Sequence, residues 1–172
     1  MVSSLDGFIA KKDQSVSWMH SQDHFEEGIE LTQEYSNHFL ASIDCYIMGS
    51  KTYEHALKLG WPYGNTPVYV FTTRMLKKVN QSVQFVSGDL AEIVTLKLKP
   101  NYSNIWMVGG ASLTKSFLKS GLADEINISI IPILLGEGTL FFDYIDKEQP
   151  LHLKKSTSFK DGMVELWYEI KK

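Results

Sequence analysis

Hydrophobic and polar residues alternate along the C-terminal tail of the chain. Residues 164–170 place apolar side chains at every second position, which is the period of a strand with one buried face. The pair Asp161-Gly162 separates this segment from the stretch that begins at Leu151, and Asp-Gly between two such segments is a strong hairpin signal. The tail therefore predicts two antiparallel strands.

The rest of the chain divides into short apolar runs and amphipathic segments, several of them ended by glycine. β-branched, aromatic and other apolar residues predict strands at residues 1–4, 45–48, 68–74, 105–108 and 125–135. Helical spacing of apolar residues, or a glycine in the stop position, predicts helices at residues 21–39, 50–60, 90–98 and 112–119. Ser21 is the expected N-cap of the first helix, with Glu26 and Glu27 in its first turns.

The order of these elements indicates an α/β protein. Strands alternate with helices and a hairpin follows, which is typical of a mostly parallel central sheet with helices on both faces and a C-terminal antiparallel β-hairpin. The chain has 172 residues and no internal repeat or Pro/Gly-rich linker, so we expect one domain, residues 1–172. Sheets of this kind bind ligands beyond the carboxyl ends of their strands.

Charge and composition exclude several classes of partner. The net charge is −3 and no run of Lys or Arg forms a basic stripe, so we expect neither nucleic acid nor a membrane surface as partner. The most apolar stretch, residues 128–135, is too short to span a bilayer. The first residues do not resemble a signal peptide, and we expect a cytoplasmic location. Cys45 lies in apolar sequence with no basic neighbour, which predicts a buried structural thiol.

Two adjacent glycines, Gly109 and Gly110, stand between a predicted strand and a predicted helix in IWMVGGASL. Each glycine costs roughly 1 kcal/mol of backbone entropy relative to alanine, so this corner must require a backbone without side chains. Such a corner lets a phosphate approach the N–H groups of a helix start. Turn chemistry or packing is the alternative, and the pattern is not the G-x-G-x-x-G of Rossmann dehydrogenases.

Several stretches that occur in one order favour the phosphate. They are SSLDGFIA (3–10), YIMGSKTYE (46–54), VYVFTTR (68–74) and IWMVGGASLTKSFLKSGLADEINISIIPILLGEGTLFF (105–142). Together they resemble the dihydrofolate reductase-like fold, above all the C-terminal reductase domain of bacterial riboflavin-biosynthesis deaminase-reductases and its small single-domain relatives. The resemblance covers nearly the whole chain.

The resemblance implies an NADPH-dependent reductase that transfers hydride to a C=N or C=O group of a pyrimidine- or pteridine-like small molecule. The most similar activity is that of 5-amino-6-(5-phosphoribosylamino)uracil reductase. The riboflavin enzymes usually carry Lys where this chain has Phe8, and their basic residues for a ribose phosphate have no clear match here, so a different, unphosphorylated substrate stays open. Dihydrofolate reductase activity and a non-catalytic nucleotide-binding relative of the fold are the alternatives.

The resemblance also implies residues for each part of the cofactor. The glycine turn against the pyrophosphate and nicotinamide, often with a cis peptide between the glycines, is matched by Val108, Gly109, Gly110, Ala111, Ser112 and Leu113. The second helix start, which holds phosphate, is matched by Gly49, Ser50, Lys51 and Thr52. Thr72, Thr73 and Arg74 match the strand end that contacts the adenosine 2′-phosphate, with a solvated loop cation as the alternative for Arg74. Ala10 matches the loop over the nicotinamide.

On the substrate side the resemblance implies Leu5, Trp18, Glu27 and Ser129 as binding residues and Asp6 and Asp23 as catalytic residues. Asp23 stands at the spacing from Trp18 of the carboxylate that binds the pterin and assists protonation in dihydrofolate reductases. A buried carboxylate there could hold a proton near neutral pH. The alternative is that Asp23, Glu26 and Glu27 are acids favoured at the N-terminus of a helix.

His20, His24 and Glu27 have a spacing that could bind a metal ion. No cysteine or second histidine cluster accompanies them, so we expect no metal. The expected partners are a small-molecule substrate and a second copy of the chain, since relatives often form homodimers through sheet-edge strands.

Overall fold

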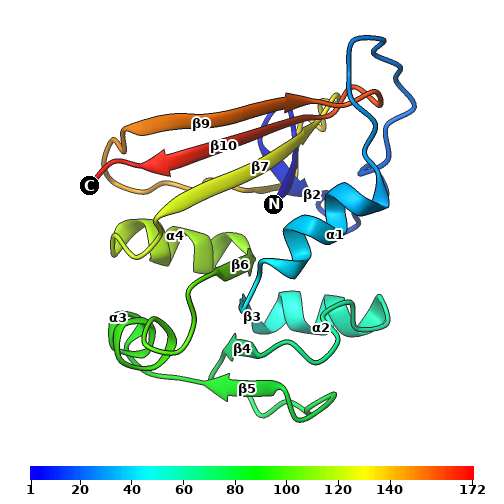
Figure 1. Ribbon diagram of the computed structural model, residues 1–172. Helices are drawn as coiled ribbons and strands as arrows, with labels where there is room; N and C mark the ends of the chain where they lie inside the picture. Colours follow the sequence, from blue (N-terminus) through cyan, green and yellow to red (C-terminus); the bar gives the residue numbers. More distant parts are fainter. The chain divides into compact units, whose positions relative to one another are not determined.

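A computed structural model describes residues 1–172, which form two compact units (Figure 1). The first unit joins Met1–Tyr35 to Ala123–Lys172, and the second is Ser36–Leu122. Helix α1 (Gln33–Ala41) contributes residues to both units. No helix combines the length and the apolar character that crossing a membrane requires. The single domain predicted for residues 1–172 stays a prediction.

The second unit is built on a parallel sheet with the strand order β5-β4-β3-β6. Its strands are β3 (Cys45–Gly49), β4 (Val68–Phe71), β5 (Val83–Val86) and β6 (Ile105–Gly109). Helices follow the strands: α2 (Ser50–Lys58), α3 (Leu90–Glu92) with the π-helix η1 (Ile93–Leu98), and α4 (Ala111–Lys119). Near-continuous apolar runs such as Cys45–Gly49 suit strands that are covered on both faces.

The core of the second unit lies between this sheet and α2. Its buried residues are Tyr46, Met48, Tyr53, Val68, Val70 and Val83. Cys45 is also fully buried, and burial raises the pKa of its thiol to about 12. The sequence prediction of a buried structural thiol is therefore confirmed.

The first unit contains the sheet β1-β7-β10-β9. Strand β1 (Val2–Ser4) pairs in parallel with β7 (Glu125–Ile131), whereas β10 (Val164–Ile170) runs antiparallel to β7 and to β9 (Leu151–Ser158). A separate pair joins β2 (Phe8–Ala10) to β8 (Thr139–Leu140). Trp18, Ile131, Phe159 and Met163 form the buried cluster of this unit.

The predicted fold class is confirmed: the chain is an α/β protein with a parallel sheet, helices and a C-terminal antiparallel hairpin. The hairpin turns at Gly162, whose φ is +77°. Two predicted strands are shorter than expected, since β4 ends at Phe71 and β7 ends at Ile131, one residue before Pro132. Strands β2, β5 and β8 were not predicted.

The helix predicted over residues 21–39 is wrong in its first half, because helix α1 begins only at Gln33. The backbone before it bonds to the hairpin instead: Phe25 donates to Lys160 O at 2.7 Å, and Ile29 exchanges bonds with Ser158 and Lys160. A helix would need those N–H groups for its own carbonyls. Ser21 therefore caps no helix.

The side chains near the false helix start have other roles. Ser21 Oγ accepts a bond from the backbone N–H of Asp23 at 3.1 Å, which forms a local turn. Thr32 Oγ1 accepts from the N–H of Tyr35 at 3.1 Å and caps α1. The explanation of Asp23, Glu26 and Glu27 as acids of a helix N-terminus is therefore also wrong.

Candidate functional site

The carboxyl ends of three neighbouring strands carry the predicted cofactor residues of the second unit. Because β3, β4 and β6 are parallel, their carboxyl ends meet at one edge of the sheet. Gly49 lies opposite Phe71, the last residue of β4, and Met48 lies opposite Gly109, the last residue of β6. The sheet thus brings Gly49, Thr72 and Gly109 to the same edge.

Two helix starts at this edge have no side-chain cap. Gly49 is the N-cap of α2 and Gly110 is the N-cap of α4, and neither first turn contains an acidic residue. The two starts are close together, since a Cβ on Gly110 would lie 3.5 Å from Thr52 Oγ1. Backbone N–H groups and the positive ends of two helix dipoles therefore converge, which is an arrangement suited to an anion.

The backbone conformation requires glycine at one of the two positions of the glycine pair. Gly109 is buried and has a φ of +123°, a conformation that residues with a side chain rarely adopt. Gly110 has an ordinary φ of −91°, so only the space beside Thr52 restricts it. The peptide bond between the two glycines is cis, as the family resemblance implies.

Arg74, just after β4, is already engaged by a carboxylate. Its Nη1 and Nη2 donate to Glu54 Oε2 and Oε1 at 2.9 and 2.7 Å, and its backbone N–H donates to Thr72 Oγ1 at 3.0 Å. The hydrogen bond from Arg74 lowers the pKa of Glu54, and the same bond raises the pKa of Arg74. Sequence reasoning missed Glu54, although it lies within the quoted stretch YIMGSKTYE.

In the first unit, Asp6 holds two distant loops together. Its Oδ1 accepts from Ser4 Oγ at 2.6 Å and from Leu135 N at 3.1 Å, and its Oδ2 accepts from Gly136 N at 2.7 Å. These bonds, that from Ser4 first, lower the pKa of Asp6. An ionised carboxylate with these donors is suited to position the exposed Leu5 and its loop rather than to donate a proton.

Asp23 and Glu27 lie in exposed loop positions, so the expectation of a buried carboxylate at Asp23 is wrong. Asp23 packs against the hairpin turn, because a Cβ on Gly162 would lie 2.4 Å from Asp23 Oδ2. Ser129 is half-buried on β7, directly opposite Glu165 of β10, and Glu165 accepts a hydrogen bond from the hydroxyl of Tyr35 at 2.8 Å. Neither Glu165 nor Tyr35 was predicted to be a site residue.

Trp18 and Ala10 are buried in the first unit. The indole N–H of Trp18 has no hydrogen-bond partner, which is uncommon for a buried donor. Ala10 ends β2, and its carbonyl oxygen would lie 2.2 Å from a Cβ on Gly138. Apart from Ala10, the predicted cofactor residues all belong to the second unit, whereas the predicted substrate and catalytic residues all belong to the first. No three His, Cys, Asp or Glu side chains group as metal ligands would.

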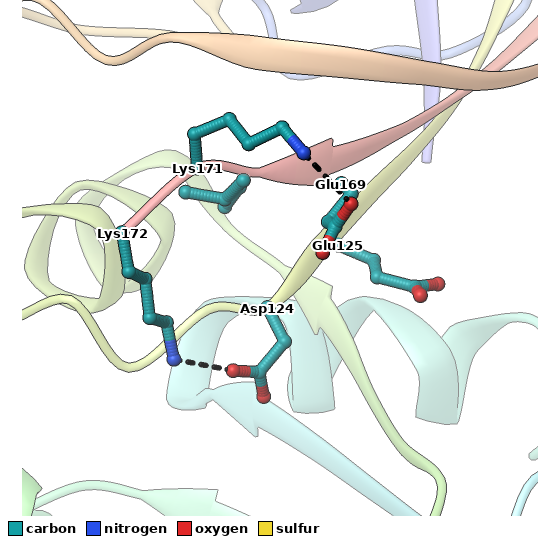
Figure 2. Close-up of a pocket in the computed structure, with 6 residues that line it drawn as sticks. Asp124, Glu125, Glu169, Lys171 and Lys172 are labelled. Carbon is teal, nitrogen blue, oxygen red and sulfur yellow. Dashed lines mark hydrogen bonds and ion pairs between the residues drawn. The ribbon is translucent and has the colours of Figure 1, made fainter.

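A hollow at the end of β10 contains none of the predicted site residues. Figure 2 shows its lining, which is Asp124, Glu125, Glu169, Ile170, Lys171 and Lys172. The charges there pair with one another: Lys172 contacts Asp124 at 2.5 Å and Lys171 contacts Glu169 at 3.4 Å. These exposed pairs leave little net charge with which to attract a ligand.

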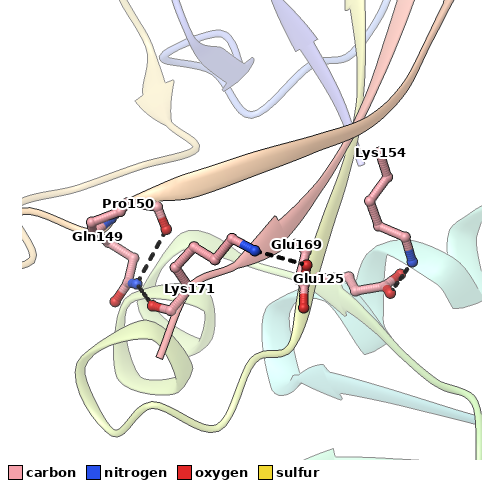
Figure 3. A network of polar contacts seen from close by, with 6 residues as sticks. All are labelled: Glu125, Gln149, Pro150, Lys154, Glu169 and Lys171. Atoms are coloured by element: carbon pink, nitrogen blue, oxygen red, sulfur yellow. Dashed lines mark hydrogen bonds and ion pairs between the residues drawn. The ribbon is translucent and has the colours of Figure 1, made fainter.

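The polar network around this hollow connects the ends of three strands (Figure 3). Gln149 Nε2 donates to Lys171 O at 2.5 Å, and Lys154 pairs with Glu125. Lys154 also lies over the ring of Trp167, 5.1 Å from its centroid. These contacts join β7, β9 and β10, so we assign them a structural role.

Comparison with known proteins relates this geometry to a family. The family model of the RibD C-terminal domain matches residues 1–164. The chain is 38% identical over 168 residues to the uncharacterized protein YwjB of Bacillus subtilis (strain 168), which covers 96% of this chain and 92% of that protein.

Solved structures are similar over the whole chain. A candidate riboflavin biosynthesis protein from Shewanella sp. PV-4 matches with a TM-score of 0.84 at 26% identity and covers 100% of this chain and 97% of that one. A diaminohydroxyphosphoribosylaminopyrimidine deaminase/5-amino-6-(5-phosphoribosylamino)uracil reductase from Thermotoga maritima has the same fold, with a TM-score of 0.68 at 15% identity over 99% of this chain and 55% of that one.

Proposed function

The chain belongs to the RibD C-terminal domain family, and on this basis we propose that it is an NADPH-dependent reductase of a pyrimidine- or pteridine-like small molecule. One observation carries the proposal: two uncapped helix starts adjoin at the carboxyl edge of a parallel sheet. The reductase activity in the name of the Thermotoga protein is the model for the reaction.

The residues at this edge fit a dinucleotide phosphate. The starts of α2 and α4 offer backbone N–H donors, Thr52 offers a hydroxyl group, and the exposed Lys51 offers a positive charge. No acid in either first turn repels an anion. Gly109 and Gly110 keep side chains away from the backbone that the phosphate would approach.

The bound cofactor would supply the hydride, and the protein would supply orientation and electrostatics. In this proposal Asp6 holds Leu5 and its loop in place through Ser4, Leu135 and Gly136. Trp18 and Ser129 contact the substrate. Because Asp23 is exposed, the proton that must accompany the hydride comes from water, and the Asp23 carboxylate orders that water.

We take the substrate to lack the ribose phosphate of the riboflavin pathway. Phe8 occupies the position of a lysine that the riboflavin enzymes usually carry, and it is partly buried on β2 beside Leu140. An aromatic side chain there cannot bind phosphate. Assays of NADPH oxidation with dihydrofolate, riboflavin-pathway pyrimidines with and without phosphate, and quinones test this point, and turnover of the phosphorylated pyrimidine alone would contradict it.

The first test of the proposal is a direct NADPH titration, monitored by the fluorescence of the bound nicotinamide. Saturable binding with turnover of a heterocyclic substrate supports the reductase. Binding without any turnover would make the chain a non-catalytic nucleotide-binding relative, and absence of binding would refute the proposal.

The matched variants Gly110→Val and Gly110→Ala locate the cofactor site. A single Cβ makes an ordinary 3.5 Å contact with Thr52, whereas the two extra methyl groups of valine fill the space between the helix starts. We expect Gly110→Val to weaken NADPH binding by about 100-fold or more and Gly110→Ala by about tenfold or less. Circular dichroism checks that both fold, and wild-type affinity in Gly110→Val would place the cofactor elsewhere.

The homodimer expected from the family resemblance stays a prediction. Strand β9 lies at the edge of its sheet, where one row of backbone donors and acceptors pairs with no other strand of this chain. Light scattering of the purified protein measures the state of assembly.

A further inference from the structure

We propose that Glu54 sets the cofactor preference of this chain: its ion pair with Arg74 opposes a 2′-phosphate and makes NADH an acceptable cofactor. The inference rests on the proposed function, because it requires a nicotinamide dinucleotide at the carboxyl edge of the second unit's sheet. It concerns Glu54, a residue that neither the sequence motifs nor the cofactor contacts described above assign.

The position of the pair carries the argument. Glu54 lies in α2, one helical turn after Ser50, and Arg74 lies three residues after the last residue of β4. The same helix start and the same strand end carry the phosphate-binding and 2′-phosphate positions predicted from the sequence. The Glu54 and Arg74 side chains are 40% and 53% exposed, so a ligand can reach them from solvent.

The donors of Arg74 are only partly available. A guanidinium carries five N–H donors, and one on each terminal nitrogen is directed to a Glu54 oxygen. This parallel pair of bonds is the strong, oriented form of a carboxylate–arginine contact. A 2′-phosphate can bind only the outer donors, with the Glu54 carboxylate on the opposite side of the same guanidinium.

The charge of Glu54 distinguishes NADPH from NADH. Arg74 and Lys58 hold the pKa of Glu54 below its ordinary value, so the carboxylate is charged at neutral pH. A phosphate bound to Arg74 is repelled by this carboxylate over a distance of a few ångströms. A ribose hydroxyl has no charge to repel, and a carboxylate is the group that accepts its hydrogen bond in NAD sites.

The experiment measures the dissociation constants of NADPH and NADH by equilibrium titration of the wild type and of Glu54→Gln. The glutamine keeps the shape and removes the charge. We expect NADPH to bind about 5- to 10-fold more tightly and NADH to bind equally or more weakly. The matched control is Glu169→Gln, which removes an equal charge from the exposed pair with Lys171 and should leave the ratio unchanged.

A double variant tests whether Glu54 acts through Arg74. Arg74→Ala alone should weaken NADPH by about tenfold and NADH little. In the Arg74→Ala background, Glu54→Gln should favour NADPH by a smaller factor than in the wild type, because it then removes only the direct repulsion of the phosphate and releases no guanidinium donors. A full effect in that background would overturn the role of the ion pair.

The outcomes separate this inference from the proposed function. If the wild type binds neither dinucleotide, the proposed function fails. If it binds NADPH and Glu54→Gln leaves the ratio of the two dissociation constants unchanged, the proposed function stands and the role of Glu54 is refuted.

Discussion

The two units of this protein form their candidate sites in different ways. In the second unit the site residues stand at the corners where a strand passes into the next segment, so one parallel sheet brings them together. In the first unit they depend on contacts between distant parts of the chain, such as Asp6 with Gly136 and Tyr35 with Glu165, each 130 residues apart. Short-range sequence signals therefore predict the candidate site of the second unit far better than that of the first unit.

The largest expected effect is on the folding of the first unit. In Gly28→Ala the new Cβ would lie 2.4 to 2.5 Å from backbone atoms of Phe159 and Lys160, and backbone cannot move aside without breaking the hydrogen bonds there. We expect a loss on the order of 3–5 kcal/mol in the free energy of unfolding, measured by urea denaturation.

Gly49→Ala is the matched control in the second unit. A Cβ on Gly49 meets nothing within 4 Å and its φ is −85°, so the loss should be about 1 kcal/mol or less. Equal losses for the two variants would show that the long-range packing of Gly28 is not what holds residues 21–32 in place.

The next effect separates turnover from cofactor binding. Asp23→Asn keeps the shape of the side chain and removes its titratable group, so turnover should fall by about 100-fold while the NADPH dissociation constant stays unchanged. Glu26→Gln, in the same exposed loop, is the control. A parallel loss of NADPH affinity would contradict the assignment of cofactor binding to the second unit and of substrate chemistry to the first. Unchanged turnover would show that Asp23 has no part in the mechanism.

The smallest effect is the pH dependence of stability. The native pKa of Asp6 is lowered, so its bonds stabilise the fold above about pH 4 and this contribution disappears as the pH falls through the native pKa. Asp6→Asn should therefore lower the urea midpoint at neutral pH, and the difference from the wild type should shrink in acid.

Asp13→Asn provides the comparison, because the pKa of Asp13 is also lowered, chiefly by a backbone bond from Ser15 only two residues away. This turn forms between neighbouring residues and depends little on the rest of the fold. Asp13→Asn should therefore change the urea midpoint less than Asp6→Asn does. A larger difference for Asp13 would mean that the Asp6 clamp contributes little.

Local signals explain what the sequence could predict. Apolar runs ended by glycine identify β3 and β6, and the glycines at positions 60 and 121 end α2 and α4 with φ values of +86° and +63°. The pair Asp161-Gly162 identifies the hairpin. In each case the residues that decide the structure are neighbours in the sequence, so propensity and turn chemistry suffice.

Pairing between distant parts of the chain explains the features that the sequence could not predict. The apolar spacing of residues 25–39 suits a helix, yet the hairpin binds the backbone of residues 25–29 and prevents one. The role of Glu54 could not be predicted for a similar reason, since its partner Arg74 lies 20 residues away. Asp6 was singled out for catalysis, whereas its role as an acceptor for Leu135 and Gly136 becomes visible only once the two loops meet.

The burial of Cys45 gives the protein an internal reporter. It is the chain's single cysteine, it lies in the central part of the second unit's sheet, and its thiol, with a pKa of about 12, is almost entirely protonated and shielded. An alkylating reagent therefore reacts only with molecules in which that sheet has opened. The labelling rate in native buffer consequently measures how often the second unit's sheet opens, and it requires no assay of activity.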